Sequence, residues 1–120
     1  TTRPIHLAIG ICPDGQDSQY GQSWSDKNPN EQTISVAVFF NFLKNTATLG
    51  IRSRYIEALP LAESFEGGGG HPMACGCRID KLAIPYEHVS NGVTDGMEWI
   101  VYEIEERVKN LWGVGVEANV

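Results

Sequence analysis

Three stretches of the chain alternate apolar and polar residues with the period of two that is typical of β-strands. Residues 5–11 carry an isoleucine or leucine at every odd position, and residues 34–42 carry an apolar residue at every even position. Phe39 lies on the other face of the second stretch, which indicates a central strand covered on both sides. The third alternation, at 47–51, follows a predicted turn at Lys44-Asn45. The second and third strands should therefore form an antiparallel hairpin.

The helical pattern is strongest at residues 97–112, where apolar residues recur at i, i+3, i+4 and i+7. Asp95 and Glu98 are spaced as in a capping box, so this amphipathic helix is expected to begin near Asp95. Gly113 is expected to end it. Residues 85–96 are rich in Pro, Asn, Gly and Asp, and they predict a loop.

A shorter apolar stripe at 61–65 follows Pro60, which suits the first turn of a helix. Four glycines at 67–70 then predict the C-terminal cap of this helix. Pro72 predicts the start of a second short helix, after which residues 77–84 are expected to be extended. Residues 13–32 are polar with almost no aliphatic residues, and they predict a long surface loop that Tyr20 and Trp24 could hold in place.

The order of these elements indicates one small α/β domain over residues 1–120, with a mixed sheet of about five strands flanked by helices. No apolar stretch reaches the ~20 residues that span a bilayer, so no membrane partner is expected. Three cysteines at irregular spacing do not predict a disulfide framework, which favours a reducing, cytoplasmic setting. The chain begins with threonine rather than methionine, which suggests a piece of a longer protein.

The charge limits the partners that the chain can bind. The formal net charge is −6, and only 9 residues are lysine or arginine. Long nucleic acids are bound by neutralising many phosphates, for which this chain is poorly supplied. A small phosphorylated ligand held by a few local donors remains compatible with this composition.

Such donors are predicted around the glycine run. Gly68, Gly69 and Gly70 would let backbone N–H groups approach an anion closely, and His71 would add a side-chain donor at the expected helix start. Arg52 and Arg54 share one face of their strand and offer guanidinium groups that pair with phosphate. Ser53 points to the other face of a regular strand, so it joins this group only if the strand ends or twists there.

Residues 68–76 read Gly-Gly-Gly-His-Pro-Met-Ala-Cys-Gly, which resembles the GGGHxxAAG signature of DHH-superfamily phosphoesterases. This signature lies in the substrate-binding domain that follows their catalytic domain, as in RecJ-like nucleases and nano-RNA oligoribonucleases. Residues 49–54 resemble the S-x-R-S strand end that precedes the signature. Cys75 replaces the usual second alanine, and Gly50 stands where the family often has serine.

The resemblance implies a domain that binds the terminal phosphate or nucleotide of a short single-stranded oligonucleotide or a dinucleotide. Its expected contacts are Arg52, Ser53, Arg54, Gly68, Gly69, Gly70 and His71. The family's Asp-His-His motif and its Mn²⁺ or Mg²⁺ ions belong to a separate catalytic domain, and this chain has no Asp-His-His. No cofactor and no catalytic residue are therefore expected in this chain, which should bind and orient a substrate without cleaving it. A homodimer is compatible with this expectation.

Two other functions fit the same residues. The amphipathic helix at 97–112 could serve a non-enzymatic interaction or dimerisation module, in which the glycine loop is only structural. His71, Cys75 and Cys77 are three metal-ligating residue types within seven positions, although their spacing is not a usual zinc pattern. In that case the chain would be an independent metal-dependent enzyme.

Overall fold

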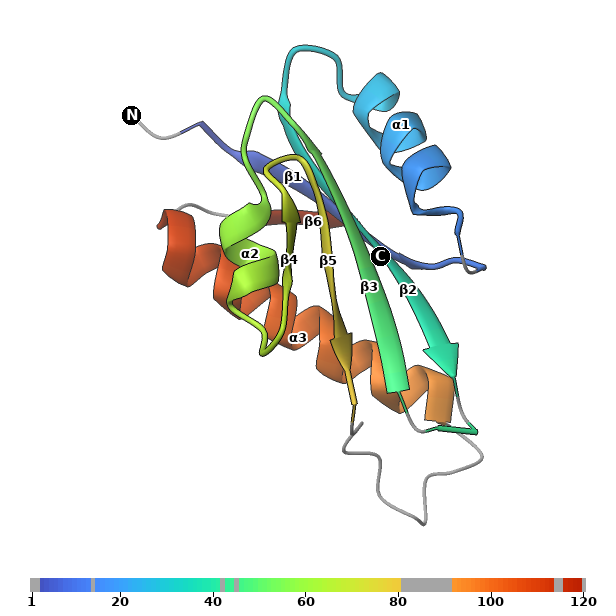
Figure 1. The fold of residues 1–120 in the computed structure, drawn as a ribbon. Helices are drawn as coiled ribbons and strands as arrows, with labels where there is room; N and C mark the ends of the chain where they lie inside the picture. Colours follow the sequence, from blue (N-terminus) through green and yellow to red (C-terminus); the bar gives the residue numbers. More distant parts are fainter. Residues whose placement is uncertain are drawn as a thin grey trace.

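The computed structural model describes residues 3–13, 15–41, 43–44, 46–80, 92–113 and 116–119 (Figure 1). In chain order the elements are β1 (Ile5–Ile11), α1 (Asp17–Lys27), β2 (Gln32–Asn41), β3 (Thr46–Arg54), α2 (Leu59–Glu63), β4 (Gly69–His71), β5 (Ala74–Ile79), α3 (Gly92–Trp112) and β6 (Val116–Asn119). The described strands form a single sheet in the order β4-β5-β3-β2-β1-β6. The prediction of a small α/β domain is confirmed.

The sheet is mixed, as expected. β1 pairs in parallel with both β2 and β6, whereas β2, β3, β5 and β4 pair antiparallel in succession. The β2–β3 hairpin confirms the pairing predicted from the two alternating stretches. The sheet has six strands rather than about five, because short strands form at the glycine run (β4) and after α3 (β6).

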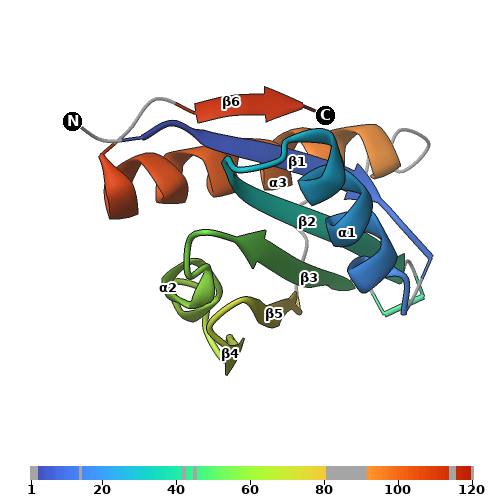
Figure 2. The same ribbon diagram turned by 90° about the horizontal axis from the view of Figure 1, so that it is seen from above.

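The helices divide between the two faces of the sheet, with α1 on one side and α2 and α3 on the other (Figure 2). On the α2–α3 side the sheet presents its aliphatic residues, which form one core with buried residues of the two helices. The fully buried members with the largest side chains are Ile5, Leu7, Ile9, Ile34, Val36, Val38, Leu49, Ile51, Leu61, Ile100, Ile104 and Val108. We call this the apolar face. Burial of this area is the main favourable contribution to folding.

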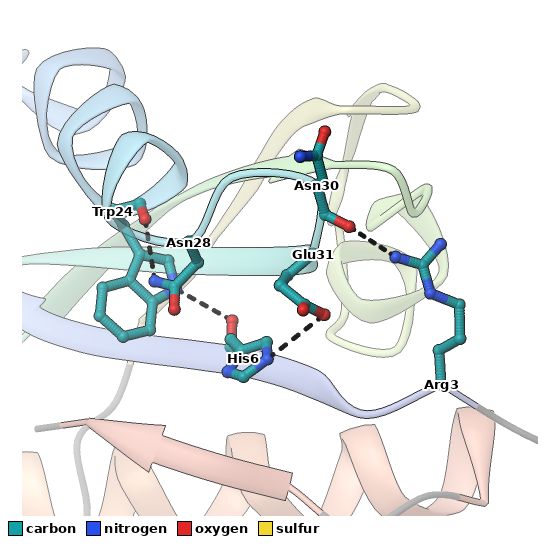
Figure 3. Close-up of polar contacts among 6 residues, drawn as sticks. All are labelled: Arg3, His6, Trp24, Asn28, Asn30 and Glu31. Atoms are coloured by element: carbon teal, nitrogen blue, oxygen red, sulfur yellow. Dashed lines mark hydrogen bonds and ion pairs between the residues drawn. The ribbon is translucent and has the colours of Figure 1, made fainter.

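The opposite face, which we call the α1 face, is built from small and polar residues. Of the α1 residues, only Gly21 and Ser25 are buried, and the Ser25 and Thr33 hydroxyls lie 3.0 Å apart in a buried hydrogen bond. Trp24 fixes the helix on β1 by donating from Nε1 to the His6 carbonyl at 2.9 Å (Figure 3). Trp24 therefore holds this segment in place, as predicted, but the segment is helical.

The expectation of a long loop at 13–32 is thus wrong for residues 17–27. An amphipathic helix is recognised by its aliphatic stripe, and α1 has none. Its fully buried residues, Gly21 and Ser25, are small, and its large side chains, Tyr20 and Trp24, are aromatic and only half-buried, so no aliphatic stripe marks the helix. Figure 3 shows how the following turn is held, where Glu31 lies 3.7 Å from His6 and Arg3 donates to the Asn30 carbonyl at 2.7 Å.

The prediction of a helix starting at Pro72 is also wrong. Pro72 and Met73 form the turn of a β4–β5 hairpin, and β5 begins directly afterwards at Ala74. Cys75 and Cys77 of β5 are both buried on the apolar face, so the period-two pattern of these residues outweighs the preference of proline for a helix start. The Pro72 carbonyl instead accepts hydrogen bonds from the Ala58 and Leu59 amides at 2.8 and 3.2 Å, which ties the turn to the start of α2.

The remaining boundaries differ by smaller amounts. α2 has Pro60 in its first turn, as predicted, but it ends at Glu63 with Ser64 as its C-cap, so the glycine run is not its cap. The extended segment begins at Ala74 rather than at residue 77, and its expected end at 81–84 lies outside the described residues. α3 begins at Gly92, so Asp95 lies inside the helix and the predicted capping box is wrong. The amphipathic helix at 97–112 is confirmed. Residues 85–91 of the predicted loop lie outside the described residues, and the prediction is wrong for residues 92–96, which belong to α3.

Candidate functional site

Strand register places three of the residues of interest in one row across the sheet. Arg52 of β3 pairs with Ala74 of β5, and Ala74 pairs with His71 of β4. Directly paired residues point to the same face, so Arg52 and His71 project on the α1 face with the small Ala74 between them. Neighbouring strands lie about 4.8 Å apart, which puts the Arg52 and His71 backbones roughly 10 Å apart. The Arg52 and His71 side chains are therefore separated on this face by the single small side chain of Ala74.

The next row along the same strands has no side chains at all. Gly50, Gly76 and Gly69 are paired across β3, β5 and β4. A Cβ at Gly76 would lie 2.5 Å from the Leu49 carbonyl oxygen, so only glycine fits there, whereas a Cβ at Gly69 would meet nothing within 4 Å. In this row the strands therefore carry no side chains, and the surface above Gly69 of β4 is open. β4 is the edge strand of the described sheet, so one side of its backbone has no strand partner.

Both arginines of β3 are paired with carboxylates of α1. The Arg52 Nε donates to Asp17 Oδ2 at 3.0 Å, and the Arg52 Nη2 lies 3.0 Å from the same oxygen. Arg54 Nη1 lies 3.6 Å from Asp26 Oδ1 in a longer and more exposed pair. The guanidinium of Arg52 is thus held from one side, and its Nη1 has no partner among the described residues. The pairing also balances the charge of both arginines, so the site is less cationic than the sequence alone suggested.

α1 and β3 interlock through one glycine on each element. A Cβ at Gly21 of α1 would lie 2.6 Å from the Arg52 Cβ, and a Cβ at Gly50 of β3 would lie 2.5 Å from the Asp17 Cβ. Asp17 and Gly21 are four residues apart and so share one side of the helix. The position where the resembled family often has serine is therefore occupied here by glycine, beneath the Asp17 side chain.

The other predicted contacts are placed differently. Gly68 is backed against α2, where a Cβ would clash with the Ala62 carbonyl. Gly70 has a φ of +133°, and a Cβ there would lie 2.8 Å from the Cys75 Cα, so the β4–β5 hairpin requires glycine at this position. Ser53 pairs with Ile34 and points to the apolar face, where its Oγ is buried without a hydrogen-bond partner among the described residues. The site therefore brings together Arg52, Arg54, His71 and the backbone near Gly69, and it leaves Ser53 out.

The predicted metal-ligating trio is divided between the two faces. His71 points to the α1 face and is exposed, whereas Cys75 and Cys77 are buried on the apolar face. Within the part of the chain that the structure describes, no group of three or more His, Cys, Asp or Glu side chains is placed to hold a metal ion. Burial raises the pKa of the Cys77 thiol to about 11, so this residue is a neutral core side chain at neutral pH.

The pKa values of two groups near the start of α1, the Cys12 thiol and the Tyr20 phenol of the helix itself, are also raised. Burial raises the pKa of the Cys12 thiol, and the negative charge of Asp17 adds to this shift. Burial likewise raises the pKa of the Tyr20 phenol, with a smaller contribution from Cys12. The Tyr20 hydroxyl lies over Gly10, where an added Cβ would be 2.8 Å away. Arg52 and His71 are thus the side chains best placed to bind an anion in this region.

Sequence reasoning missed Asp17, Gly21 and Tyr55. The first two would have been found if 17–27 had been predicted as a helix, because their i, i+4 spacing puts a carboxylate and a close-packing residue on one side. Tyr55 follows Arg54 with a φ of +62°, which is unusual for a bulky residue, and its side chain is 54% exposed. No sequence signal marks that conformation.

Comparison with known proteins adds no family to this picture, since neither a family model nor a curated protein matches the chain. Among the described helices, none combines the length and the apolar character needed to cross a membrane. The functional interpretation depends on the geometry of the site and on the resemblance of residues 68–76.

Proposed function

We propose that this chain is the substrate-binding domain of a DHH-type phosphoesterase, and that it holds the terminal phosphate or nucleotide of a short single-stranded oligonucleotide or dinucleotide. The observation that carries this proposal is the row of Arg52, Ala74 and His71 on one face of three adjacent strands. A guanidinium and an imidazole would then be available to a ligand on the two sides of Ala74. Charge-assisted hydrogen bonds of this kind are the stronger ones in proteins.

The backbone of the hairpin supports the same proposal. The outer edge of β4 has no strand partner among the described residues, so its outward-pointing N–H groups could donate to a part of the ligand that extends past His71. These donors come from a strand edge, so the contribution of a helix N-terminus, which the sequence suggested, is not part of the proposal. Arg54 lies two residues beyond Arg52 on the same face. It provides a second cation for the part of the oligonucleotide beyond its terminal phosphate.

In this proposal the two halves of the parent enzyme have different roles. As the resemblance implies, we place the Mn²⁺ or Mg²⁺ in a catalytic domain in the same polypeptide. This chain contributes binding and orientation. Holding the phosphate in place raises its effective concentration at the catalytic groups, and such positioning can account for a large share of a rate enhancement.

Titration of the chain with a 5′-phosphorylated dinucleotide, followed by NMR, tests the proposal. We expect shifts at the amides of residues 67–72 and at the Arg52 side chain, with weak affinity because the catalytic domain is missing. Arg52→Ala and His71→Ala should each weaken binding about tenfold or more, as expected for losing one charge-assisted contact. Arg3→Ala is the matched control, since Arg3 is an exposed arginine that donates to the Asn30 carbonyl outside this row.

The absence of shifts at 67–72 at millimolar ligand would overturn the proposal. If His71→Ala leaves ligand binding intact and changes the oligomeric state instead, the chain is an interaction module and the glycine hairpin is structural. Circular dichroism of each variant distinguishes loss of binding from loss of folding.

A further inference from the structure

A cavity of about 150 Å³ lies on the α1 face beside the proposed phosphate site, and no step of the proposed function uses it. It is lined by Pro13, Gly15, Asp17, Ala37, Phe39, Thr48 and Gly50. Gly50 is two residues from Arg52 on β3, so the cavity begins about 7 Å along the strand from the phosphate row. We infer that this cavity is a subsite for a pyrimidine base that carries an exocyclic amino group, namely cytosine; this inference rests on the proposed function.

The size and the walls of the cavity favour a single aromatic ring. A cavity of about 150 Å³ holds one benzene-sized molecule, whereas a purine has two fused rings. Phe39 and Thr48 are directly paired across β2 and β3, so both point to the α1 face, one with an aromatic ring and one with a hydroxyl. Aromatic side chains stack on bases. Ala37, which is paired with Gly50, presents only a methyl group at the wall of the cavity.

The polar group that selects the base is Asp17. Its Oδ2 accepts both donors of Arg52, and Oδ1 has no partner among the described residues. Asp17 also lines the cavity, so it lies between Arg52 of the proposed phosphate site and the proposed base subsite. A carboxylate only accepts hydrogen bonds, so it favours a base edge with a donor. The N4 amino group of cytosine is such a donor, whereas uracil presents the O4 acceptor at that position.

The packing of α1 fixes this carboxylate in place. The Asp17 Cβ sits directly over Gly50, and Gly21 in the next turn sits over the Arg52 Cβ. A side chain at either glycine would move the helix and, with it, the carboxylate. Gly50 therefore leaves space for Asp17, the residue that we expect to recognise the base.

The test is a titration of the 120-residue chain with inorganic phosphate, cytidine 5′-monophosphate and uridine 5′-monophosphate. We expect the cytidine nucleotide to bind about tenfold more tightly than the uridine nucleotide, the lower range for one selective contact to a base edge. In Asp17→Asn the amide oxygen accepts from Arg52 and the NH₂ group faces the base, so the preference should reverse toward uridine. Phe39→Ala should weaken both nucleotides about tenfold through lost stacking, and leave phosphate binding unchanged.

Asp26→Asn is the matched control. It removes the same charge from the same helix, but Asp26 pairs with Arg54 and does not line the cavity, so the cytidine preference should persist. Equal affinity for the two nucleotides, or a cytidine preference retained in Asp17→Asn, overturns the inference. Phosphate binding with no gain from either nucleotide also overturns it while leaving the proposed function intact. If neither phosphate nor nucleotide binds, both fail.

Discussion

The two faces of the sheet use the same strands for different purposes. On the apolar face, β1, β2 and β3 present isoleucine, leucine and valine that are almost fully buried against α2 and α3. On the α1 face, the alternate residues of these strands are mostly small or polar, and two glycines allow α1 to approach closely. The comparison shows that large apolar side chains stabilise the fold on one face, while their scarcity on the other leaves a cavity and two arginine–aspartate pairs beside α1.

The largest effect should come from opening a cavity on the apolar face. Ile51 is 0% exposed, and Ile51→Ala removes three methyl or methylene groups from the core. We expect a loss of about 2–5 kcal/mol in the free energy of unfolding, measured by urea denaturation. Thr48→Ala, on the same strand and the opposite face, should change it by less than about 0.5 kcal/mol. Similar losses in both variants would contradict the difference between the faces.

The apolar face should also show the stronger response to high pH. The Cys77 pKa is raised from 9.0 to about 11 by burial. The thiol therefore ionises at a lower pH in the unfolded state, and the stability that depends on it is complete below pH 9 and is lost as the pH rises toward 11. A shift of two pKa units corresponds to roughly 2–3 kcal/mol.

Chemical denaturation at pH 7, 9 and 10.5 checks this expectation by comparing the protein with Cys77→Ala. The difference in unfolding free energy between them should shrink or change sign at the highest pH, because the variant lacks the titrating thiol. Tyrosines and lysines titrate in both proteins, so their contribution cancels. A difference that is independent of pH would show that Cys77 ionises equally in both states.

On the α1 face, adding a single carbon atom should lower the free energy of unfolding only where α1 packs on the sheet. Gly50→Ala places a Cβ 2.5 Å from the Asp17 Cβ, so the helix must shift, and we expect a loss of about 1–3 kcal/mol. Gly69→Ala meets nothing within 4 Å and should change the unfolding free energy by less than about 0.5 kcal/mol. Thermal denaturation of the pair gives the comparison. Equal losses would mean that α1 does not pack on Gly50 as described.

The same contrast explains which parts of the fold could be predicted from the sequence. β1, β2, β3 and the main part of α3 contribute to the apolar face, and their aliphatic periodicity reports that burial directly. α1 packs through Gly21 and Ser25, whose small side chains give no hydrophobic signal, so its sequence resembles that of a loop. Pro72 suggested a helix start because local preference cannot reveal the pairing of β5 with β3.

The candidate site was partly predictable for related reasons. Arg52 and His71 were identified from the residue types and the resemblance, and strand register places both on one face. Asp17 could not be identified, because its role depends on a helix that crosses over β3 from a different part of the chain. Ser53 was included on the basis of the motif, although the regular alternation of β3 directs it to the apolar face.

The smallest effect should come from the outer ion pair of the α1 face. Arg54 Nη1 lies 3.6 Å from Asp26 Oδ1, and the Asp26 side chain is 61% exposed. Water and salt screen such a pair, so Asp26→Asn should change the unfolding free energy by no more than about 0.5 kcal/mol, with no salt dependence beyond that of the unmodified protein. Urea denaturation at low and high ionic strength measures both quantities. A loss above about 2 kcal/mol, comparable to that for a core residue, would mean that the charges of the α1 face stabilise the fold. Arg54 would then be committed to structure, and only Arg52 and His71 would remain to bind a phosphate.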